Sequence, residues 1–242
     1  MMRDMMVRTA ALLIVGDEIL NGEVEDRNTR LLTRGLWNAG IEVERALWLR
    51  DRPAAIARAV AEAAGAADLV FVCGGIGPTH DDCTRPAVGS ALGLPLERHS
   101  EAEERLRRAY GERLEAADLE MADLPRGARL VVGRRSGVFG FQVERVVVLP
   151  GIPELLEDIL ETALAGLRGP ARYREEIAVP CGEGILAPLL REVQGHYPDV
   201  AIGSYPTLVG GRFRVRLVLR SLDRIRLDSA TEELKGLLGA VS

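Results

Sequence analysis

Cysteine is scarce in this sequence, and long apolar runs are missing. The three cysteines, Cys73, Cys83 and Cys181, show neither the spacing of a metal site nor a disulfide framework. The apolar run at residues 9–15 is too short to span a bilayer, and it does not resemble a cleavable signal. We therefore expect free thiols, no membrane partner and a cytoplasmic location.

An excess of positive charge is also missing. The chain has 31 lysines and arginines against 36 acidic residues, a net charge of −5, and the two signs are interspersed. Clusters such as Arg105, Arg107 and Arg108 lie among glutamates on a helical pattern, which is typical of a solvated helix face. Because binding to a phosphate backbone requires a basic patch, we expect no nucleic-acid partner.

The sequence does contain enough apolar material for a sizeable core. Of its 242 residues, 47% are hydrophobic, which suits one large domain or two unequal ones. Strand-like and helix-like patterns alternate as far as residue 164. We expect strands at residues 10–15, 41–49, 69–73, 129–132 and 143–149, and helices at residues 27–39, 52–64, 84–92, 100–114 and 153–164. This alternation predicts a three-layer α/β/α fold around a mostly parallel sheet.

Three single residues are expected to serve the fold. Asp51 precedes a helix whose first turn holds Pro53, so it is expected to be the N-cap of that helix. Trp37 and Trp48 occupy apolar positions of a predicted helix and a predicted strand. We expect both indole rings to pack in the core.

The composition changes at Arg168-Gly169-Pro170, which predicts two domains, residues 1–168 and 169–242. Beyond the boundary the patterns have the order β-α-β-β-α, typical of a small α+β domain. We expect strands at residues 173–179, 199–205 and 212–220, a helix at residues 184–194, a turn at Gly210-Gly211, and a last helix after Asp228.

A glycine-rich loop, residues 74–79, stands between the predicted strand at 69–73 and the predicted helix at 84–92. Glycines let backbone N–H groups approach an anion, and a helix N-terminus adds favourable potential. The loop therefore predicts a phosphate site. As an alternative, Thr79 and Asp82 form only a capping box, and the glycines only shape the turn.

Two further segments rich in glycine and acidic residues, 16–22 and 149–151, also follow predicted strands. Since the carboxyl ends of parallel strands meet at one edge of the sheet, where ligands bind, we expect all three segments on one rim. Carboxylates near a phosphate suit a bridging divalent cation such as Mg²⁺ or Mn²⁺. The expected carboxylate cluster consists of Asp17, Glu18, Asp26, Asp81 and Asp82.

The sequence also allows purely structural or solvent-exposed roles for some of these residues. Asp17 and Asp26 could equally be solvated loop residues or helix caps. His80 stands beside two aspartates, and a single histidine there is expected to be an exposed or outer group rather than the catalytic base.

These motifs resemble a known family. Residues 15–22 (VGDEILNG), Asp26-x-Asn28-Thr29 and residues 74–84 (GGIGPTHDDCT) are similar to the molybdopterin-binding-like (MoaB/Mog) superfamily, above all to the N-terminal part of the competence/damage-inducible protein CinA. They also resemble the first domain of eukaryotic FAD synthase, and residues 149–153 (LPGIP) match a later family motif. The resemblance covers residues 8–167, and residues 202–206 (IGSYP) look like the small KH-like domain of the CinA group.

The resemblance implies a cation-dependent nucleotide pyrophosphatase that releases AMP from ADP-ribose or from a dinucleotide such as FAD. Its cofactor would be Mg²⁺, Mn²⁺ or Co²⁺, and its assembly a homo-oligomer, a dimer by resemblance. The alternative is a molybdopterin- or nucleotide-binding module related to molybdenum cofactor biosynthesis, without turnover. Deamidation of nicotinamide mononucleotide and FAD synthesis are not expected, because they need further domains.

The same resemblance implies a set of site residues. Asp81, Asp82 and Glu18 are the expected catalytic residues, and together with Asp17 they are the expected cation ligands. The expected substrate-binding residues are Gly16, Asp17, Asn28, Gly74, Gly75, Gly77, Pro78, Thr79, Pro150 and Gly151.

Overall fold

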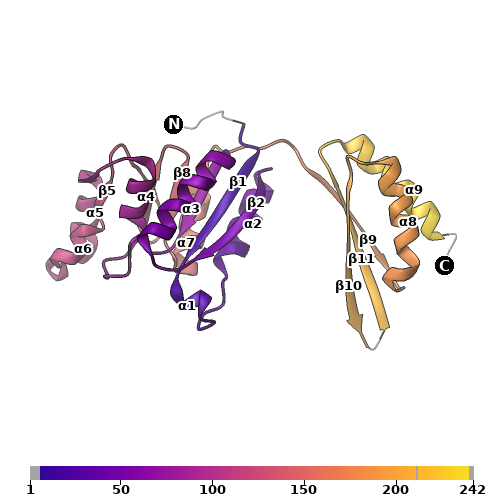
Figure 1. Cartoon of the computed structure of the whole chain (residues 1–242), viewed down its shortest axis with the longest axis horizontal. Helices are drawn as coiled ribbons and strands as arrows, with labels where there is room; N and C mark the ends of the chain where they lie inside the picture. The colour runs from indigo at the N-terminus through magenta and orange to yellow at the C-terminus, as the bar shows by residue number, and fades with distance from the viewer. Residues whose placement is uncertain (1–5, 211, 240–242) are drawn as a thin grey trace. The chain divides into compact units, whose positions relative to one another are not determined.

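Figure 1 shows a computed structural model of the chain, which describes residues 6–210 and 212–239. The chain forms two compact units, residues 1–169 and residues 170–242. No helix within the described residues is both long enough and apolar enough to cross a membrane. All three cysteines are free thiols.

The first unit is built on a six-stranded sheet with the order β2-β1-β3-β8-β7-β6. Strands β2, β1, β3 and β8 are parallel, whereas β7 runs antiparallel to both of its neighbours. The strands are β1 (Thr9–Val15), β2 (Glu42–Leu49), β3 (Leu69–Cys73), β6 (Arg129–Val132), β7 (Phe139–Val143) and β8 (Val146–Leu149).

Alternate residues of β1 face two separate hydrophobic cores. Leu12 and Ile14 pack with residues of α2 (Asn28–Asn38) and α7 (Pro153–Leu164). Leu13 packs on the opposite face of the sheet, where the helices are α3 (Pro53–Ala66), α4 (Thr84–Leu92) and α5 (Ser100–Tyr110). Both faces of the sheet are therefore covered, and the predicted α/β/α layers and mostly parallel sheet are confirmed.

One predicted strand is in fact a hairpin. Of the expected strand at residues 143–149, residues 146–149 form β8 and Val143 ends β7, which begins at Phe139; Glu144 in the turn between them has a φ of 49°. The predicted helix at 100–114 ends at Tyr110 and continues as a short 3₁₀ turn, because Gly111 adopts a positive φ of 56°. Short elements without a clear sequence pattern are α1 (Asp17–Leu20), α6 (Ala116–Glu120), β4 (Leu96–Arg98) and β5 (Asp123–Pro125).

The second unit has the predicted β-α-β-β-α order and an antiparallel sheet, β10-β11-β9. Helix α9 begins before Asp228, because Asp223 Oδ1 accepts the backbone N–H groups of Ile225 and Arg226. Gly210 has a positive φ of 57°, as a hairpin turn requires, and Gly211 lies outside the described residues. The elements are β9 (Tyr173–Val179), α8 (Glu183–His196), β10 (Ala201–Val209), β11 (Arg212–Ser221) and α9 (Arg224–Gly239).

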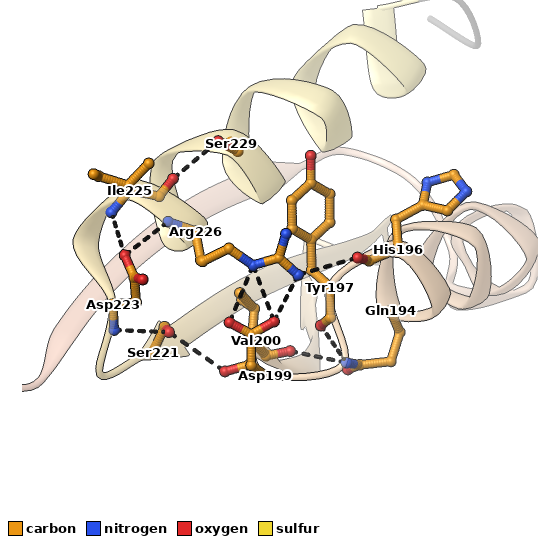
Figure 2. Close-up of polar contacts among 10 residues, drawn as sticks. All are labelled: Gln194, His196, Tyr197, Asp199, Val200, Ser221, Asp223, Ile225, Arg226 and Ser229. Atoms are coloured by element: carbon orange, nitrogen blue, oxygen red, sulfur yellow. Dashed lines mark hydrogen bonds and ion pairs between the residues drawn. The ribbon is translucent and has the colours of Figure 1, made fainter.

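A polar network joins the C-terminal end of α8 to the N-terminal end of α9 (Figure 2). The guanidinium of Arg226 donates to Asp199 Oδ1 at 2.7 Å and to the carbonyl of His196 at 3.2 Å, and it lies 4.7 Å from the centre of the Tyr197 ring. Gln194 Nε2 donates to the carbonyls of Tyr197 and Val200. These contacts fix the two helices above one face of the sheet.

Candidate functional site

The carboxyl ends of β1, β2, β3 and β8 meet at one rim of the sheet in the first unit. Gly16 N–H donates to the carbonyl of Leu49 at the end of β2, at 3.0 Å. Gly74 N–H donates to the carbonyl of Leu149 at the end of β8, at 3.1 Å. The segments that follow the strands are therefore in direct contact, as the parallel order of the strands requires.

The glycines allow this close approach. Gly74 has a φ of 108°, and a Cβ there would lie 2.2 Å from the carbonyl oxygen of Val15. A Cβ on Gly151 would lie 3.1 Å from Gly74 Cα. Gly75 has a φ of 65°, and a Cβ there would lie 2.5 Å from Thr84 Oγ1. Side chains at these positions would push the rim segments apart.

A cavity of about 750 Å³ opens at this rim. Its lining includes ten of the thirteen residues expected from the sequence: Gly16, Glu18, Gly74, Gly75, Gly77, Pro78, Asp81, Asp82, Pro150 and Gly151. Asp17, Asn28 and Thr79 do not line it. Each of those three instead supports a residue that does.

Thr79 and Asp82 close a turn at the end of the glycine-rich loop. Asp82 Oδ2 accepts the backbone N–H of Thr79 at 2.9 Å and its hydroxyl at 2.5 Å. The residue before helix α4 is Cys83, and no side chain caps that helix end. The pair is therefore not a helix cap, and Asp82 retains a carboxylate in the cavity lining.

Asp81 and His80 belong to the same turn, but only Asp81 lines the cavity. A hydrogen bond from the Thr79 side chain holds the pKa of Asp81 below its usual value. The His80 side chain is 97% exposed, and its Nδ1 lies 4.0 Å from Asp81 Oδ1. His80 does not line the cavity, in keeping with the outer position expected for it.

Asp51 is a further residue of the site, in a role not expected from the sequence. It was expected to cap helix α3, but the N-cap residue is Arg52, and Asp51 lines the cavity. Asp17 N–H donates to Asp51 Oδ2 at 2.8 Å, and Asp51 N–H donates to Asp17 Oδ1 at 3.3 Å. The available signal is its position two residues after the strand at residues 41–49, at the same end of the sheet as Gly16 after β1.

The electrostatic surroundings of Asp51 are unfavourable for its charge. Burial raises the pKa of Asp51, and the negative charges of Asp17, Asp81 and Asp82 raise it further. Opposing this, the Asp17 backbone N–H stabilises the carboxylate. The rim therefore has an excess of negative charge beside its glycine-rich loop.

Asp26 does not belong to this group. Its carboxylate accepts the Thr29 backbone N–H at 3.0 Å, the Thr29 hydroxyl and Trp48 Nε1–H at 2.7 Å. Burial raises the pKa of Asp26, but these hydrogen bonds outweigh it, so the pKa lies below its usual value. Asp26 is a cap for the first turn of α2.

Trp48 is 46% exposed on the edge strand β2, so its expected place in the core is wrong.

Asn28 connects two rim segments. It is buried, and its Nδ2 donates to the carbonyl of Gly151 at 2.6 Å. Its Oδ1 has no hydrogen-bond partner among the residues described. The expected substrate-binding role of Asn28 is therefore indirect in this structure, through the position of Gly151.

A second missed residue, Arg85, lies in the cavity wall. It is only 7% exposed, and its Nη2 donates to the carbonyl of Gly77 at 3.0 Å. Burial lowers the pKa of Arg85, against the charges of Asp82, Asp123 and Glu120. Arg85 thus fixes the loop that carries Gly77.

The far side of the cavity is apolar. It is formed by α5, the segment from the end of α6 to β5, β7 and the start of α7, with the side chains of Leu106, Tyr110, Met121, Leu124, Phe139, Phe141, Ile152 and Leu155. Polar loop and apolar wall together suit a ligand with a phosphate group at one end and a flat ring system at the other.

Asp158 on α7 holds the turn between β6 and β7 against this cavity. Its Oδ2 accepts the backbone N–H of Ser136 at 2.8 Å and the Ser136 hydroxyl at 2.5 Å, and its Oδ1 accepts Arg135 N–H at 3.0 Å. The hydrogen bonds from Ser136 hold the pKa of Asp158 far below its usual value. Ser136 and Gly137 line the cavity.

The rim residues offer hard oxygen donors but not a complete cation shell. Across residues 6–210 and 212–239, no three His, Cys, Asp or Glu side chains converge as a ligand set. Mg²⁺ commonly takes one or two carboxylates from a protein and completes its shell with water and substrate phosphate oxygens. Asp81 and Asp82 fit a site of that incomplete kind.

Comparison with known families gives two matches. The family described as "Probable molybdopterin binding domain" matches residues 11–168, and the family described as "FAD synthase, middle domain" matches residues 171–242.

Individual relatives point the same way. A "CinA-like protein" of Anaeromyxobacter dehalogenans is 41% identical over 149 residues, which are 59% of this chain, and the chain spans only 36% of that relative's length. A protein of Aeropyrum pernix is 37% identical over 216 residues, with 81% of this chain and 78% of the relative covered. The crystal structure of "the protein CinA with unknown function from Thermoplasma acidophilum" superposes with a TM-score of 0.60 at 29% identity, over 65% of this chain and 96% of that one.

Proposed function

This chain belongs to the probable molybdopterin binding domain family, and from the glycine-rich loop and the carboxylates of its cavity we propose that it is a cation-dependent nucleotide pyrophosphatase. The first unit has the MoaB/Mog-like α/β fold, and the chain is a relative of CinA-like proteins. The proposed substrate is ADP-ribose or a related dinucleotide such as FAD, with AMP as one product.

One observation carries the proposal. The cavity places a glycine-rich loop, able to approach a phosphate with its backbone, beside Asp51, Asp81 and Asp82. These carboxylates alone would repel a phosphate, because their charges have the same sign. Such a pairing is useful when a divalent cation lies between carboxylates and ligand, neutralising charge on the phosphates as the transition state forms.

The chain's own residues divide the remaining tasks. Gly74, Gly75 and Gly77 approach the pyrophosphate, and Asp81 and Asp82 hold the cation. Asp51 accepts the proton of the attacking water, because its raised pKa makes it a better base than an ordinary aspartate. Attack at one phosphorus breaks the bond to the bridging oxygen, which leaves with the other phosphate. The Glu18 carboxylate lies beside Gly16 in the cavity lining and helps Asp81 and Asp82 to hold the cation.

The apolar wall supports a substrate with a ring system. A cavity of about 750 Å³ can hold most of a dinucleotide, and Tyr110, Phe139 and Phe141 offer aromatic surface to a base or a flavin. The match of residues 171–242 to the FAD synthase middle domain supports including FAD among the substrates.

The test is AMP release from a panel of ADP-ribose, FAD and NAD, with Mg²⁺, Mn²⁺ or Co²⁺ and with chelator. We expect at least one substrate to yield AMP only with a cation. Analysis of the same samples by light scattering tests the dimer that the resemblance implies.

A binding module without turnover is the second candidate. It is favoured by the incomplete set of cation ligands among the residues the structure describes, and by the family's description as molybdopterin binding. It predicts saturable binding of a pterin or a nucleotide in the calorimeter, and no AMP from any member of the panel.

A further inference from the structure

The three-stranded sheet of the second unit has one covered face and one basic face. Leu217 and Leu219 of β11 belong to the hydrophobic core beneath α8 and α9. The residues that alternate with them point to the other face. There, the paired positions of the three strands bring together Arg174, Arg214, Arg216, Arg220 and Tyr205, which we name the arginine face.

The charge on the arginine face is strongly one-sided. Glu176 is the single acidic residue that the strand register places there among the described residues, and it pairs with both Arg174 and Arg216. Arg214 is exposed and has no acidic partner within the described part of the chain. Four guanidinium groups thus face one carboxylate, although the whole chain has a net charge of −5.

Tyr205 provides an aromatic surface in the middle of these charges. Its ring folds back over Gly203, where a Cβ would meet the ring at 2.9–3.1 Å. The guanidinium of Arg216 lies 5.1 Å from the ring centre, and Arg220 Nη2 donates to the Tyr205 hydroxyl at 3.2 Å. Tyr205 is 39% exposed, so the residue is held in place and still accessible.

We propose that the arginine face binds single-stranded nucleic acid. Arginines two residues apart on β11 stand about 6.7 Å apart, close to the spacing of successive phosphates in an extended strand. A basic track beside an exposed aromatic ring is the arrangement by which proteins bind single strands, with charge for the backbone and stacking for a base. We expected no nucleic-acid partner from the net charge of the whole chain. That net charge does not show that positive charge is concentrated on this one face.

The test uses the full chain and short fluorescent oligo-dT and oligo-rU strands, followed by anisotropy. Four phosphate contacts predict that affinity falls about 50-fold as salt rises from roughly 50 to roughly 200 mM, since each contact contributes about 0.7 to the logarithmic slope. Arg214→Glu should weaken binding and flatten this slope. Arg191→Glu, an exposed position on α8 with the same change of charge, is the matched control and should leave both nearly unchanged.

Two substitutions of Tyr205 distinguish the contribution of base stacking to binding from that of charge. Tyr205→Leu keeps an apolar cover on the sheet but removes the ring, so it should weaken binding by roughly tenfold, whereas Tyr205→Phe should retain binding. The proposal is overturned if neither oligonucleotide binds, or if Arg214→Glu and Arg191→Glu act equally. It is also overturned if poly-glutamate binds with the same salt slope and the same loss in Arg214→Glu, which would assign the face to an acidic protein.

Discussion

Gly77 is the glycine of the loop that best reports ligand binding. Its backbone has no positive φ, and a Cβ there would lie 2.6 Å from Asp82 Oδ2, a side chain on the cavity wall. Gly77→Ala should therefore displace the Asp82 carboxylate and weaken nucleotide binding about tenfold, or about 1.4 kcal/mol, measured by titration calorimetry. Circular dichroism should show an intact fold.

Gly75 differs from Gly77 because its backbone has a positive φ, so a substitution there should also affect the fold. With a φ of 65° and Thr84 Oγ1 2.5 Å from a Cβ, Gly75→Val should lose thermal stability as well as binding. If Gly77→Ala binds nucleotide normally, the loop does not approach the ligand as we describe.

Asp51 should respond to neutralisation in two ways. The pKa of Asp51 is higher in the folded protein than in the unfolded chain, so ionisation of this carboxyl favours unfolding. The free energy of unfolding therefore falls as the pH rises through the folded-state pKa. Asp51→Asn removes this ionisation while keeping an oxygen for the Asp17 N–H. We expect a small rise in melting temperature in chelator at neutral pH, together with a large loss of turnover. An unchanged rate would exclude Asp51 as the base.

At the scale of elements, the link between α7 and the β6–β7 turn depends on one carboxylate. Because the pKa of Asp158 is far below its unfolded value, its stabilisation is complete above about pH 4 and is lost as the pH falls further. Asp158→Ala should lower the melting temperature at pH 7 and make it less sensitive to pH below 4. Glu161→Ala, one turn along α7 with an exposed ion pair to Arg134, is the control and should change little.

The sequence predicts elements well where a period or a cap is present. The buried run at residues 69–73 and the helix closed by Gly93 have their predicted bounds, because an apolar strand and an αL glycine are local signals. The hairpin at Glu144 could not be predicted, since it has neither glycine nor proline to mark the turn. Asp51 is missed for a different reason, because its place before Pro53 equally predicts a helix cap, and Arg85 because its position on α4 does not by itself show that it contacts the Gly77 loop.

At the scale of the whole molecule, each unit has a core of its own. The hydrophobic clusters of residues 7–167 and those of residues 173–238 share no residue. A fragment of residues 1–169 should therefore fold, with a single cooperative thermal transition, and retain nucleotide binding. A fragment that is unfolded, or that is folded without affinity, would show that the site depends on the second unit.

The most direct test of the central claim is the rate of AMP release from ADP-ribose with Mg²⁺, for the unaltered chain and for Asp82→Asn. Asparagine keeps an acceptor for Thr79 but removes the charge that would hold the cation. Asp26→Asn, a carboxylate outside the cavity that caps α2, is the matched control. We predict cation-dependent AMP release that falls by orders of magnitude in Asp82→Asn alone, with little change in melting temperature. Equal rates in Asp82→Asn and the unaltered chain would contradict the account.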